Sequence, residues 1–310
     1  MKSIALFVFP GFEVLDFAAV TVFELANVLS GARLYEMTML SQSGGSVPSS
    51  AGPAVDTQAG GGTAAVMDTV LVFGTVGSIP TTAPLLEMVR SACVAARRAG
   101  SICTGAELLA ATGLLDGRRV TTHWARAAEL QQRFPLLKVE PESIYIHDGK
   151  YWSSAGMTAC IDLALAMVEQ DHGEELVLRI ARQMVIYHRR ASSHSQFSTL
   201  LEMAPRSDPI QKVLSYARTH LRRHLSVDEL AGVANLSRRQ FSRRFRDETG
   251  QSPARAVESL RLESARAMIE NTRHTLDYIA RESGFAQLEQ MRRAFVRVCG
   301  APPQSLRRAA

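Results

Sequence analysis

Short apolar runs alternate with amphipathic stretches along residues 1–188. The apolar runs have the length and composition of buried strands, and they lie at 4–9, 35–40, 69–73, 100–103 and 119–122. Helical spacing of apolar residues marks the stretches at 12–29, 83–98, from 106 onward, 125–133, 158–170 and 174–187. Residues 143–153 (SIYIHDGKYWS) alternate in the manner of a β-hairpin, with Asp148-Gly149 as the turn pair.

Strands that alternate with helices predict a parallel sheet covered by helices on both faces. Residues 1–188 are therefore expected to form one open α/β domain. In such folds, ligands bind beyond the carboxyl ends of the strands. One cysteine, Cys103, lies at such an end, between the run at 100–103 and the helix that follows it.

The pattern changes completely after this domain. Residues 189–208 lose all periodicity and gain Ser, Arg and Pro, so we place a linker there. Residues 209–308 are helical throughout. Two short helices joined by a tight turn at about 227–247 predict a helix-turn-helix unit, and a second unit occupies 275–297, about 50 residues later.

In both helix pairs, the second helix has one apolar face and one polar face. The second helix of the first pair buries Phe241 and Phe245, four residues apart, and its counterpart buries Met291 and Phe295. The opposite faces carry Arg and other polar side chains. One such pair is common in any helical bundle, but two copies with exposed Arg favour DNA binding.

The net charge of +5 is divided unevenly along the chain. From residue 210 onward, 19 Lys and Arg accompany 10 Asp and Glu, whereas residues 1–209 carry 16 and 20. A basic C-terminal third suits a polyanionic partner, because cationic side chains displace the counterions condensed on phosphates. A solvated Arg-rich surface gives the same count, so charge alone leaves both interpretations open.

Composition excludes several other classes. No stretch reaches the roughly 18 uncharged apolar residues of a membrane helix, and the apolar start MKSIALFVFP runs directly into GFEVLD without a cleavage site. The four cysteines form no CxxC pair, and no His cluster has metal-ligand spacing. We therefore expect a protein of the reducing cytoplasm that binds neither a metal nor another cofactor.

The C-terminal part resembles the AraC/XylS family of transcription regulators. The matching residues are LSVDELAGVANLSRRQFSRRFRDETGQSP and LDYIARESGFAQLEQMRRAFVRVCGAPPQSLRR. The resemblance implies two helix-turn-helix units joined by a long helix, a double-stranded DNA operator as partner, and a homodimer on repeated half-sites.

The resemblance also assigns DNA-facing positions. Arg can bond to guanine, Gln to adenine, and Glu can accept from cytosine, whereas other Arg side chains contact phosphates. The base-reading positions of the family fall on Arg239, Gln240, Arg243, Glu289, Gln290 and Arg293. Contacts with phosphates or with solvent are expected from Arg246, Arg297, Arg244 and Arg292.

The N-terminal domain resembles the PfpI-type, class I glutamine amidotransferase-like domains. The resemblance rests on GSICTGAELLAATGLLDGRRVTTHW, WSSAGMTACIDLALAMVEQDHGEELVLRIARQMVIYHRR and SQFSTLL. It implies a flavodoxin-like sheet with a cysteine at a strained elbow between a strand and a helix, within reach of an acidic residue. Cys103 and either Glu13 or Asp16 occupy the matching places, and a known group of regulators fuses this domain to an AraC-type one.

Several roles for Cys103 stay open: part of a ligand pocket, nucleophile of a hydrolase or hydratase, redox-sensing thiol, or structural residue. The N–H groups of Thr104 and Gly105 favour negative charge, which lowers a thiol pKa or binds a ligand carboxylate. Thr104 stands where the peptidase members of the family place His, which favours a pocket over catalysis. His123 either lines that pocket or is a structural histidine beside Trp124.

The sequence therefore predicts a cytoplasmic, sequence-specific DNA-binding transcription regulator with a non-catalytic sensor domain. Its expected effector is a small amino-acid-derived or quaternary-amine metabolite. RNA polymerase would be a further partner if the protein activates transcription. The residues expected to bind the effector are Asp16, Cys103, Thr104, Gly105 and His123.

Overall fold

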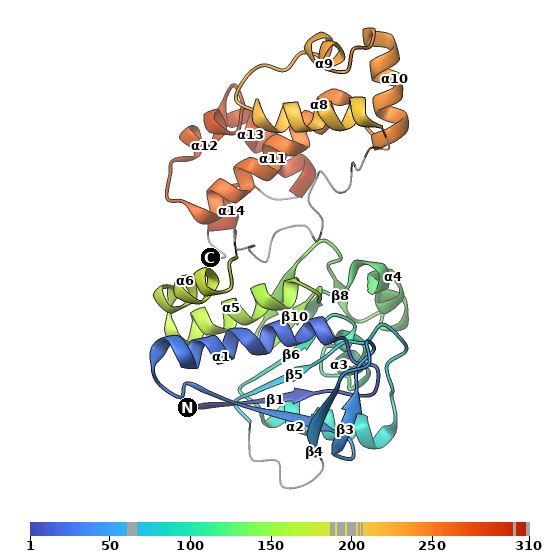
Figure 1. Ribbon diagram of the computed structural model, residues 1–310, viewed down its shortest axis with the longest axis vertical. Coiled ribbons are helices and arrows are strands. Elements are labelled where there is room, and N and C mark those ends of the chain that lie inside the picture. The colour runs from blue at the N-terminus through green and yellow to red at the C-terminus, as the bar shows by residue number, and fades with distance from the viewer. Residues whose placement is uncertain are drawn as a thin grey trace. The chain divides into compact units, whose positions relative to one another are not determined.

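The computed structural model describes residues 1–60, 67–186, 190, 196, 203, 205, 207–299 and 302–307. The chain divides into two compact units, Met1–Gln196 and Phe197–Ala310 (Figure 1). Most of the predicted linker at 189–208 lies outside the described residues.

The first unit contains a mixed sheet with the strand order β3-β4-β2-β1-β5-β6-β10-β9 in the part of the chain that is described. Its strands are β1 (Lys2–Phe7), β2 (Tyr35–Ser41), β3 (Gly45–Pro48), β4 (Ala54–Ala59), β5 (Thr69–Val72), β6 (Arg98–Ile102), β9 (Tyr145–Asp148) and β10 (Tyr151–Ser154), and a separate pair consists of β7 (Arg119–Val120) and β8 (Lys138–Val139). The helices are η1 (Val14–Phe17), α1 (Ala18–Ser30), α2 (Ala83–Ala95), α3 (Gly105–Ala111), α4 (Trp124–Arg133), α5 (Ala159–His172) and α6 (Glu174–Gln183).

The centre of the sheet is flavodoxin-like, as the sequence predicted. Strands β2, β1, β5, β6 and β10 are parallel neighbours. Numbered along the chain, these five strands have the order 2-1-3-4-5, which reverses direction between β1 and β5. Loops that leave β1 and β5 at their carboxyl ends therefore diverge and leave room for a site.

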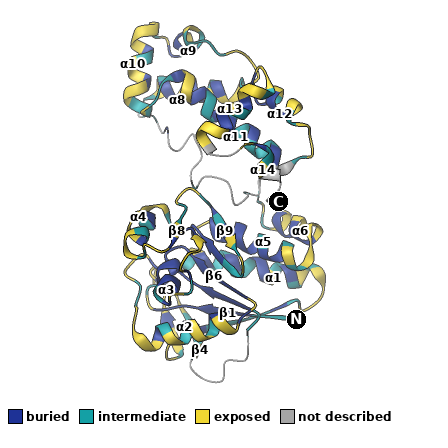
Figure 2. Ribbon diagram, turned by 180° about the vertical axis from the view of Figure 1, so that it is seen from behind, coloured by how far each residue is buried: buried dark blue, intermediate teal, exposed yellow. Residues whose placement is uncertain are grey.

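Helices cover both faces of this sheet because its strands are apolar on both sides. In β1, Ile4 and Leu6 pack with α1, α5 and α6, whereas Ala5 and Phe7 pack with α2 and α3. Figure 2 shows the buried strands between the inner faces of these helices.

The hairpin of β9 and β10 forms where the sequence predicted it, but its turn is displaced by one residue. Asp148 pairs with Tyr151, so the turn pair is Gly149-Lys150 and not Asp148-Gly149. Gly149 has a φ of 66°, the left-handed conformation that a two-residue hairpin turn requires. The Asp148 carboxylate instead accepts a hydrogen bond from the backbone N–H of Arg119 at 2.9 Å.

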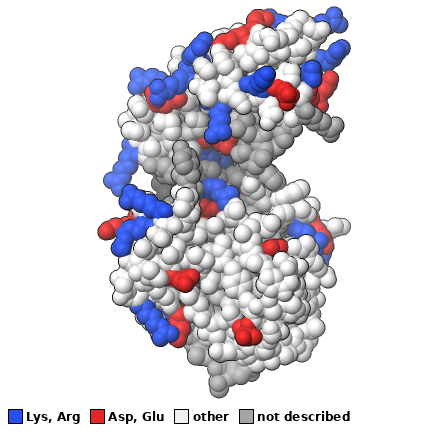
Figure 3. All heavy atoms as spheres, viewed as in Figure 1, with Lys and Arg blue, Asp and Glu red and all other residues white. Residues whose placement is uncertain are grey.

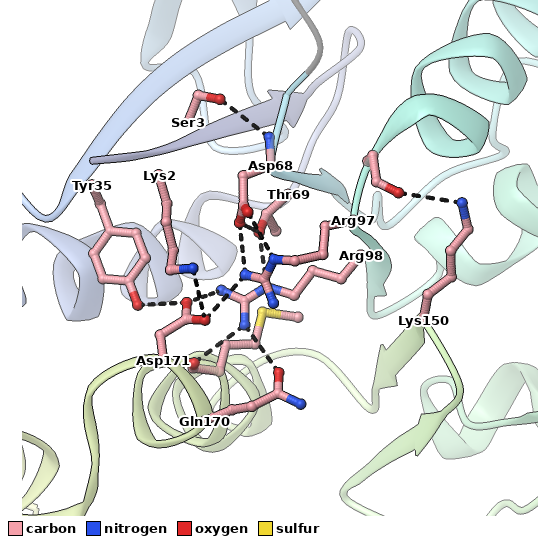
Figure 4. A network of polar contacts seen from close by, with 12 residues as sticks. Lys2, Ser3, Tyr35, Asp68, Thr69, Arg97, Arg98, Lys150, Gln170 and Asp171 are labelled. Atoms are coloured by element: carbon pink, nitrogen blue, oxygen red, sulfur yellow. Dashed lines mark hydrogen bonds and ion pairs between the residues drawn. The ribbon is translucent and has the colours of Figure 1, made fainter.

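A closed polar network lies at the amino ends of the strands (Figure 4). Its centre is Asp171 near the end of α5, whose carboxylate accepts hydrogen bonds from Arg98 at 2.6 Å, Tyr35 at 2.9 Å and Arg97 at 3.0 Å. Lys2 lies 3.5 Å from the same carboxylate. Arg98 is 2% exposed, so this ion pair joins the first residue of β6 to α5 inside the protein.

The second unit is helical throughout its described part. It consists of α8 (Asp208–Thr219), α9 (Val227–Val233), α10 (Arg238–Thr249), α11 (Pro253–Asn271), α12 (Leu276–Glu282), α13 (Leu288–Cys299) and α14 (Gln304–Arg307). Helix α11 contributes to two apolar clusters. Its first half packs with α8, α9 and α10, and its second half packs with α12 and α13.

Candidate functional site

The carboxyl ends of β1, β5 and β6 bring three loops together. Asp16 lies in η1 after β1, Thr75 follows β5, and Cys103 follows β6. Because β5 pairs with both β1 and β6, these loops are neighbours in space although they are far apart in sequence. The structure thus places the predicted acidic residue and the predicted cysteine at one edge of the sheet.

Cys103 adopts the strained backbone that the family resemblance implies. Its φ is 56°, a left-handed conformation that is uncommon for residues other than glycine. Its N–H donates to the carbonyl of Ser154 at 3.0 Å, and its carbonyl accepts from the Thr122 hydroxyl at 2.9 Å. A Cβ on Gly156 would overlap the Cys103 side chain, so a glycine is needed where this loop crosses the elbow.

Thr104 and Gly105 hold the elbow against β5. The Thr104 hydroxyl donates to the Thr75 carbonyl at 2.9 Å and accepts from the Thr75 N–H at 2.8 Å. A Cβ on Gly105 would overlap the carbonyl oxygen of Val72, which explains the glycine at this position. Both residues are buried, so the structure gives each a positioning role in the elbow.

Asp16 is fully buried and incompletely hydrogen-bonded. Its Oδ2 accepts from the Gly74 N–H at 3.0 Å, whereas Oδ1 has no hydrogen-bond partner among the described residues. The pKa of the Asp16 carboxyl is raised from 3.8 to about 7, mainly because the group is buried; the Gly74 and Met157 backbone N–H groups lower this pKa, and the neighbouring charge of Glu13 raises it. This carboxyl therefore exchanges its proton near neutral pH.

The environment of the Cys103 thiol opposes ionisation. Burial and, to a smaller extent, the Asp16 charge raise the pKa of the Cys103 thiol to about 12. The Thr104 N–H lowers this pKa but does not outweigh burial. The Thr104 N–H therefore acts in the expected direction, but the net pKa of the thiol is raised because burial and the Asp16 charge have the larger effect.

His123 lies on a different part of the same edge. Its Nδ1 accepts from the Ala125 N–H at 3.4 Å and so caps α4, and its ring centroid is 5.6 Å from that of Trp124. Partial burial lowers the pKa of the His123 imidazole. In the described part of the chain, no hydrogen bond joins the His123 ring to the Cys103 thiol. Thr122, the residue before His123, donates from its hydroxyl to the Cys103 carbonyl.

Sequence reasoning missed three residues that build this elbow: Thr75, Thr122 and Gly156. A glycine two residues after a strand is a signal that could have indicated Gly156. Nothing in the sequence marks the two threonines, because their partners lie 29 and 19 residues away. Within the described residues, no group of His, Cys, Asp and Glu could hold a metal ion, and no helix is long and apolar enough to cross a membrane.

The second unit presents two recognition helices with the predicted faces. Phe241 and Phe245 of α10 are buried, as are Met291 and Phe295 of α13. The predicted DNA-facing side chains are all exposed: Arg239, Gln240, Arg243 and Arg246 on α10, and Glu289, Gln290, Arg293 and Arg297 on α13. Figure 3 shows many Lys and Arg side chains on the surface of this unit.

The turn before each recognition helix has the same geometry. Asn235 and Gly284 have φ values of 54° and 89°, and each ends the first helix of its pair in the left-handed conformation. At Gly284 a side chain is impossible, because a Cβ would overlap the carbonyl oxygen of Leu221. Two turns of one kind, 49 residues apart, confirm the predicted duplication of the helix-turn-helix unit.

The two predicted base-reading glutamines also cap their own helices. Gln240 completes a capping box with Ser237, whose N–H donates to the Gln240 Oε1 at 3.3 Å. Gln290 Oε1 accepts from the Ala286 N–H at 3.1 Å. A bidentate contact with adenine uses the same amide oxygen, so base reading by either glutamine would require this cap to open.

The two recognition helices differ in the charge they can offer to DNA. In the described part of the chain, no carboxylate lies within ion-pair distance of Arg239, Arg243 or Arg246. On α13, Arg293 lies 3.5 Å from Glu289, and Arg297 lies 2.6 Å from Glu258 of α11. The first helix therefore presents more uncompensated positive charge.

Comparison with known proteins agrees with this division of the chain. Residues 2–170 match the DJ-1/PfpI family, and residues 230–309 match a helix-turn-helix domain. The HTH-type transcriptional regulator GbdR of Pseudomonas aeruginosa is 32% identical over 99% of this chain and 84% of its own length. An isonitrile hydratase of Pseudomonas putida is 34% identical over 38% of this chain and 52% of its own.

A solved structure supports the fold of the first unit. The crystal structure of an AraC family transcriptional regulator from Pseudomonas putida has a TM-score of 0.53 at 22% identity, and the match covers 59% of this chain and 100% of that one. Since the full-length relative is a regulator and both family matches fall on the units described, the chain belongs to the AraC-type helix-turn-helix transcriptional regulators with an N-terminal DJ-1/PfpI domain, and it is a DNA-binding regulator of transcription.

Proposed function

We propose that a small cationic metabolite binds at the carboxyl edge of the first unit and changes how the second unit binds its operator. The observation that carries this proposal is the Asp16 carboxyl, which is fully buried with one oxygen left without a hydrogen-bond partner among the described residues. An unsatisfied buried oxygen costs stability, so its retention calls for a functional reason. A ligand that pairs with this carboxylate supplies one.

The sign of the charge at the edge indicates the class of ligand. Glu13 and Asp16 interact with each other and with the Cys103 thiol, and both carboxylates raise the pKa of that thiol. A cation placed among them would reverse the unfavourable interaction, whereas an anion would increase it. This favours an amine or a quaternary ammonium group, as expected for an amino-acid-derived or betaine-like effector.

Exposed apolar side chains occur in the loops at this edge. Leu15 in η1 is 40% exposed, Val76 after β5 is 77% exposed, Trp124 at the start of α4 is 52% exposed and Met157 before α5 is 42% exposed. Such side chains suit N-methyl or methylene groups, and the Trp124 ring can bind a cation on its face. We therefore assign the effector to Asp16, Cys103 and His123 with these neighbours, and assign the recognition-helix positions to DNA.

We also propose that the protein acts as a homodimer in the cytoplasm. A homodimer would bring two pairs of recognition helices to repeated half-sites of the operator. RNA polymerase would be a further partner if the protein activates transcription. The first unit would act without catalysis, because a thiol with a pKa of about 12 is almost entirely protonated at neutral pH.

A second candidate is the chemistry of the isonitrile hydratase relative, with Cys103 as nucleophile. Cys103→Ser separates the two candidates. The serine variant should keep effector binding and effector-dependent operator binding if the site is a sensor. Loss of a measurable isonitrile turnover in the same variant would instead support the enzyme.

A thermal-shift screen of the full-length protein tests the sensor. The probes are glycine betaine, L-arginine and spermidine, and 3,3-dimethylbutanoate is the uncharged-carbon control for betaine. Ligand at about 100 times its dissociation constant stabilises the folded state by about 2.7 kcal/mol. A shift with a cationic probe that Asp16→Asn abolishes and the exposed Asp116→Asn retains supports the proposal. Equal shifts with betaine and dimethylbutanoate contradict it.

A further inference from the structure

Two described residues beyond α6, Arg190 and Gln196, bind back onto the first unit. They lie in the segment that leads from α6 to the DNA-binding unit, and Gln196 is the last residue of the first unit. Each uses both its backbone N–H and its side chain in these contacts. Some of the residues that bind Arg190 and Gln196 lie next to the elbow at Cys103.

The Gln196 amide bonds to two segments of the first unit, residues 122–124 at the start of α4 and the residues that follow β8. Its Oε1 accepts from the Trp124 N–H at 3.0 Å, and its Nε2 donates to the carbonyls of Thr122 at 2.9 Å and Pro141 at 2.7 Å. The backbone N–H of Gln196 donates to the Glu142 carbonyl at 3.0 Å. A glutamate of the same size would lose both Nε2 donors and turn a carboxylate toward these carbonyls.

Arg190 binds the first turn of α5. Its backbone N–H donates to the Asp162 Oδ1 at 3.0 Å, and its Nη2 donates to the Asp162 Oδ2 at 2.7 Å. The same Nη2 donates to the Thr158 hydroxyl at 3.0 Å. The Asp162 side chain is 6% exposed, so this contact is a nearly buried ion pair rather than a surface one.

Both anchor points adjoin Cys103. The Thr122 carbonyl holds Gln196, and the Thr122 hydroxyl holds the Cys103 carbonyl. Thr158, held by Arg190, is two residues from Gly156, whose Cα lies so close to Cys103 that a Cβ there would fall 2.7 Å from its sulfur. Two segments that adjoin the elbow thus help to hold the chain that leads to the DNA-binding unit, and Pro141 and Glu142 provide further contacts with Gln196.

We propose that Arg190 and Gln196 are coupling residues, through which a change at the Cys103 elbow loosens or tightens the restraint on the DNA-binding unit. The inference rests on the proposed function for the nature of the signal. A ligand that displaces the loop at Gly156 or the segment at Thr122 acts directly on Arg190 or Gln196.

A double-mutant cycle on the full-length protein tests this without any ligand. Gly156→Ala perturbs the elbow sterically, and Asp16→Asn perturbs it by charge. Each is combined with Gln196→Ala, and Gln183→Ala on the exposed face of α6 is the matched control. The readout is the dissociation constant for an operator duplex selected from random DNA with the wild-type protein.

We expect at least one elbow variant to change operator affinity about fivefold or more in the wild-type and Gln183→Ala backgrounds, the lower range of allosteric coupling. In the Gln196→Ala background the same change should fall below about twofold, within the error of additivity. Arg190→Ala repeats the test if Gln196→Ala fails to fold, as judged by tryptophan fluorescence.

Equal effects of the elbow variants in all backgrounds, or no effect in any, would overturn the inference. Hydrogen exchange supplies a direct check of the Gln196 contact. Gln196→Ala should speed the exchange of the Trp124 amide hydrogen, because Gln196 Oε1 accepts from that N–H. An unchanged exchange rate would also contradict the inference. The absence of a thermal shift with every cationic probe contradicts the proposed function alone, because the cycle uses no ligand.

Discussion

Replacement of Asp16 by Asn should change the pH dependence of stability in a defined direction. The pKa of the Asp16 carboxyl is about 7 in the folded protein and 3.8 without the fold. Because the folded state holds this proton more tightly, its stabilisation is complete below about pH 4. The stabilisation is lost as the pH rises through 7.

The magnitude follows from the same two pKa values. A pKa change from 3.8 to about 7 corresponds to about 4 kcal/mol in total, at about 1.4 kcal/mol per tenfold change in proton affinity. Between pH 5 and pH 8 the wild-type protein should therefore lose about 2–3 kcal/mol of unfolding free energy through this group. Asp16→Asn has no such loss, so the stability of the variant relative to wild type should rise by that amount over the same range.

Urea unfolding followed by tryptophan fluorescence measures the difference in unfolding free energy between Asp16→Asn and wild type. Both tryptophans, Trp124 and Trp152, lie in the first unit, so the signal reports the unit that contains Asp16. Asp116→Asn, at an exposed position, should run parallel to wild type. A difference in unfolding free energy between Asp16→Asn and wild type that stays constant within about 0.5 kcal/mol from pH 5 to pH 8 would refute the reasoning.

Three other substitutions test the remaining geometry. Asp171→Asn should destabilise the first unit by about 3–5 kcal/mol in urea unfolding, because Arg98 would stay buried without its carboxylate; a loss under about 1 kcal/mol contradicts this. Arg243→Ala should weaken operator binding by about 1–3 kcal/mol and relax one base position, and an equal loss on scrambled DNA would make it a phosphate contact. Arg297→Ala should cost less than Arg243→Ala and change the salt dependence less, since Glu258 already neutralises Arg297; equal losses refute this.

The sequence predicted the elements well because local patterns determine them. The long helix expected between the two helix-turn-helix units is found at Pro253–Asn271, and its N-terminal proline is a local signal for the start of a helix. The strand order could not be read, because it depends on pairings such as Ile4 with Thr69 that no local pattern encodes. The shifted hairpin turn shows that register is set by cross-strand pairing as well as by turn residues.

The site was predictable only in part. The sequence left Glu13 and Asp16 as alternatives for the acidic residue near Cys103. The structure distinguishes them, because the 3₁₀ turn at Val14–Phe17 turns Asp16 inward, whereas Glu13 remains partly exposed and caps that turn. Distant partners decided the rest: Gln196 binds residues 53 to 75 positions away, and no spacing in the sequence indicates that contact.

The two edges of the sheet show why the functional assignment falls on one of them. At the amino edge, Asp171 is surrounded by Arg98, Arg97 and Tyr35, so its charge is compensated and the cluster stabilises the fold. At the carboxyl edge, Asp16 is equally buried but lies beside another carboxylate and a thiol, and Cys103 is held in a strained conformation. A fold gains nothing from an uncompensated charge and a strained residue at one place. This contrast is why we propose the carboxyl edge as the site for a cation from outside the chain, and the loops that such a cation would move include those that hold Arg190 and Gln196.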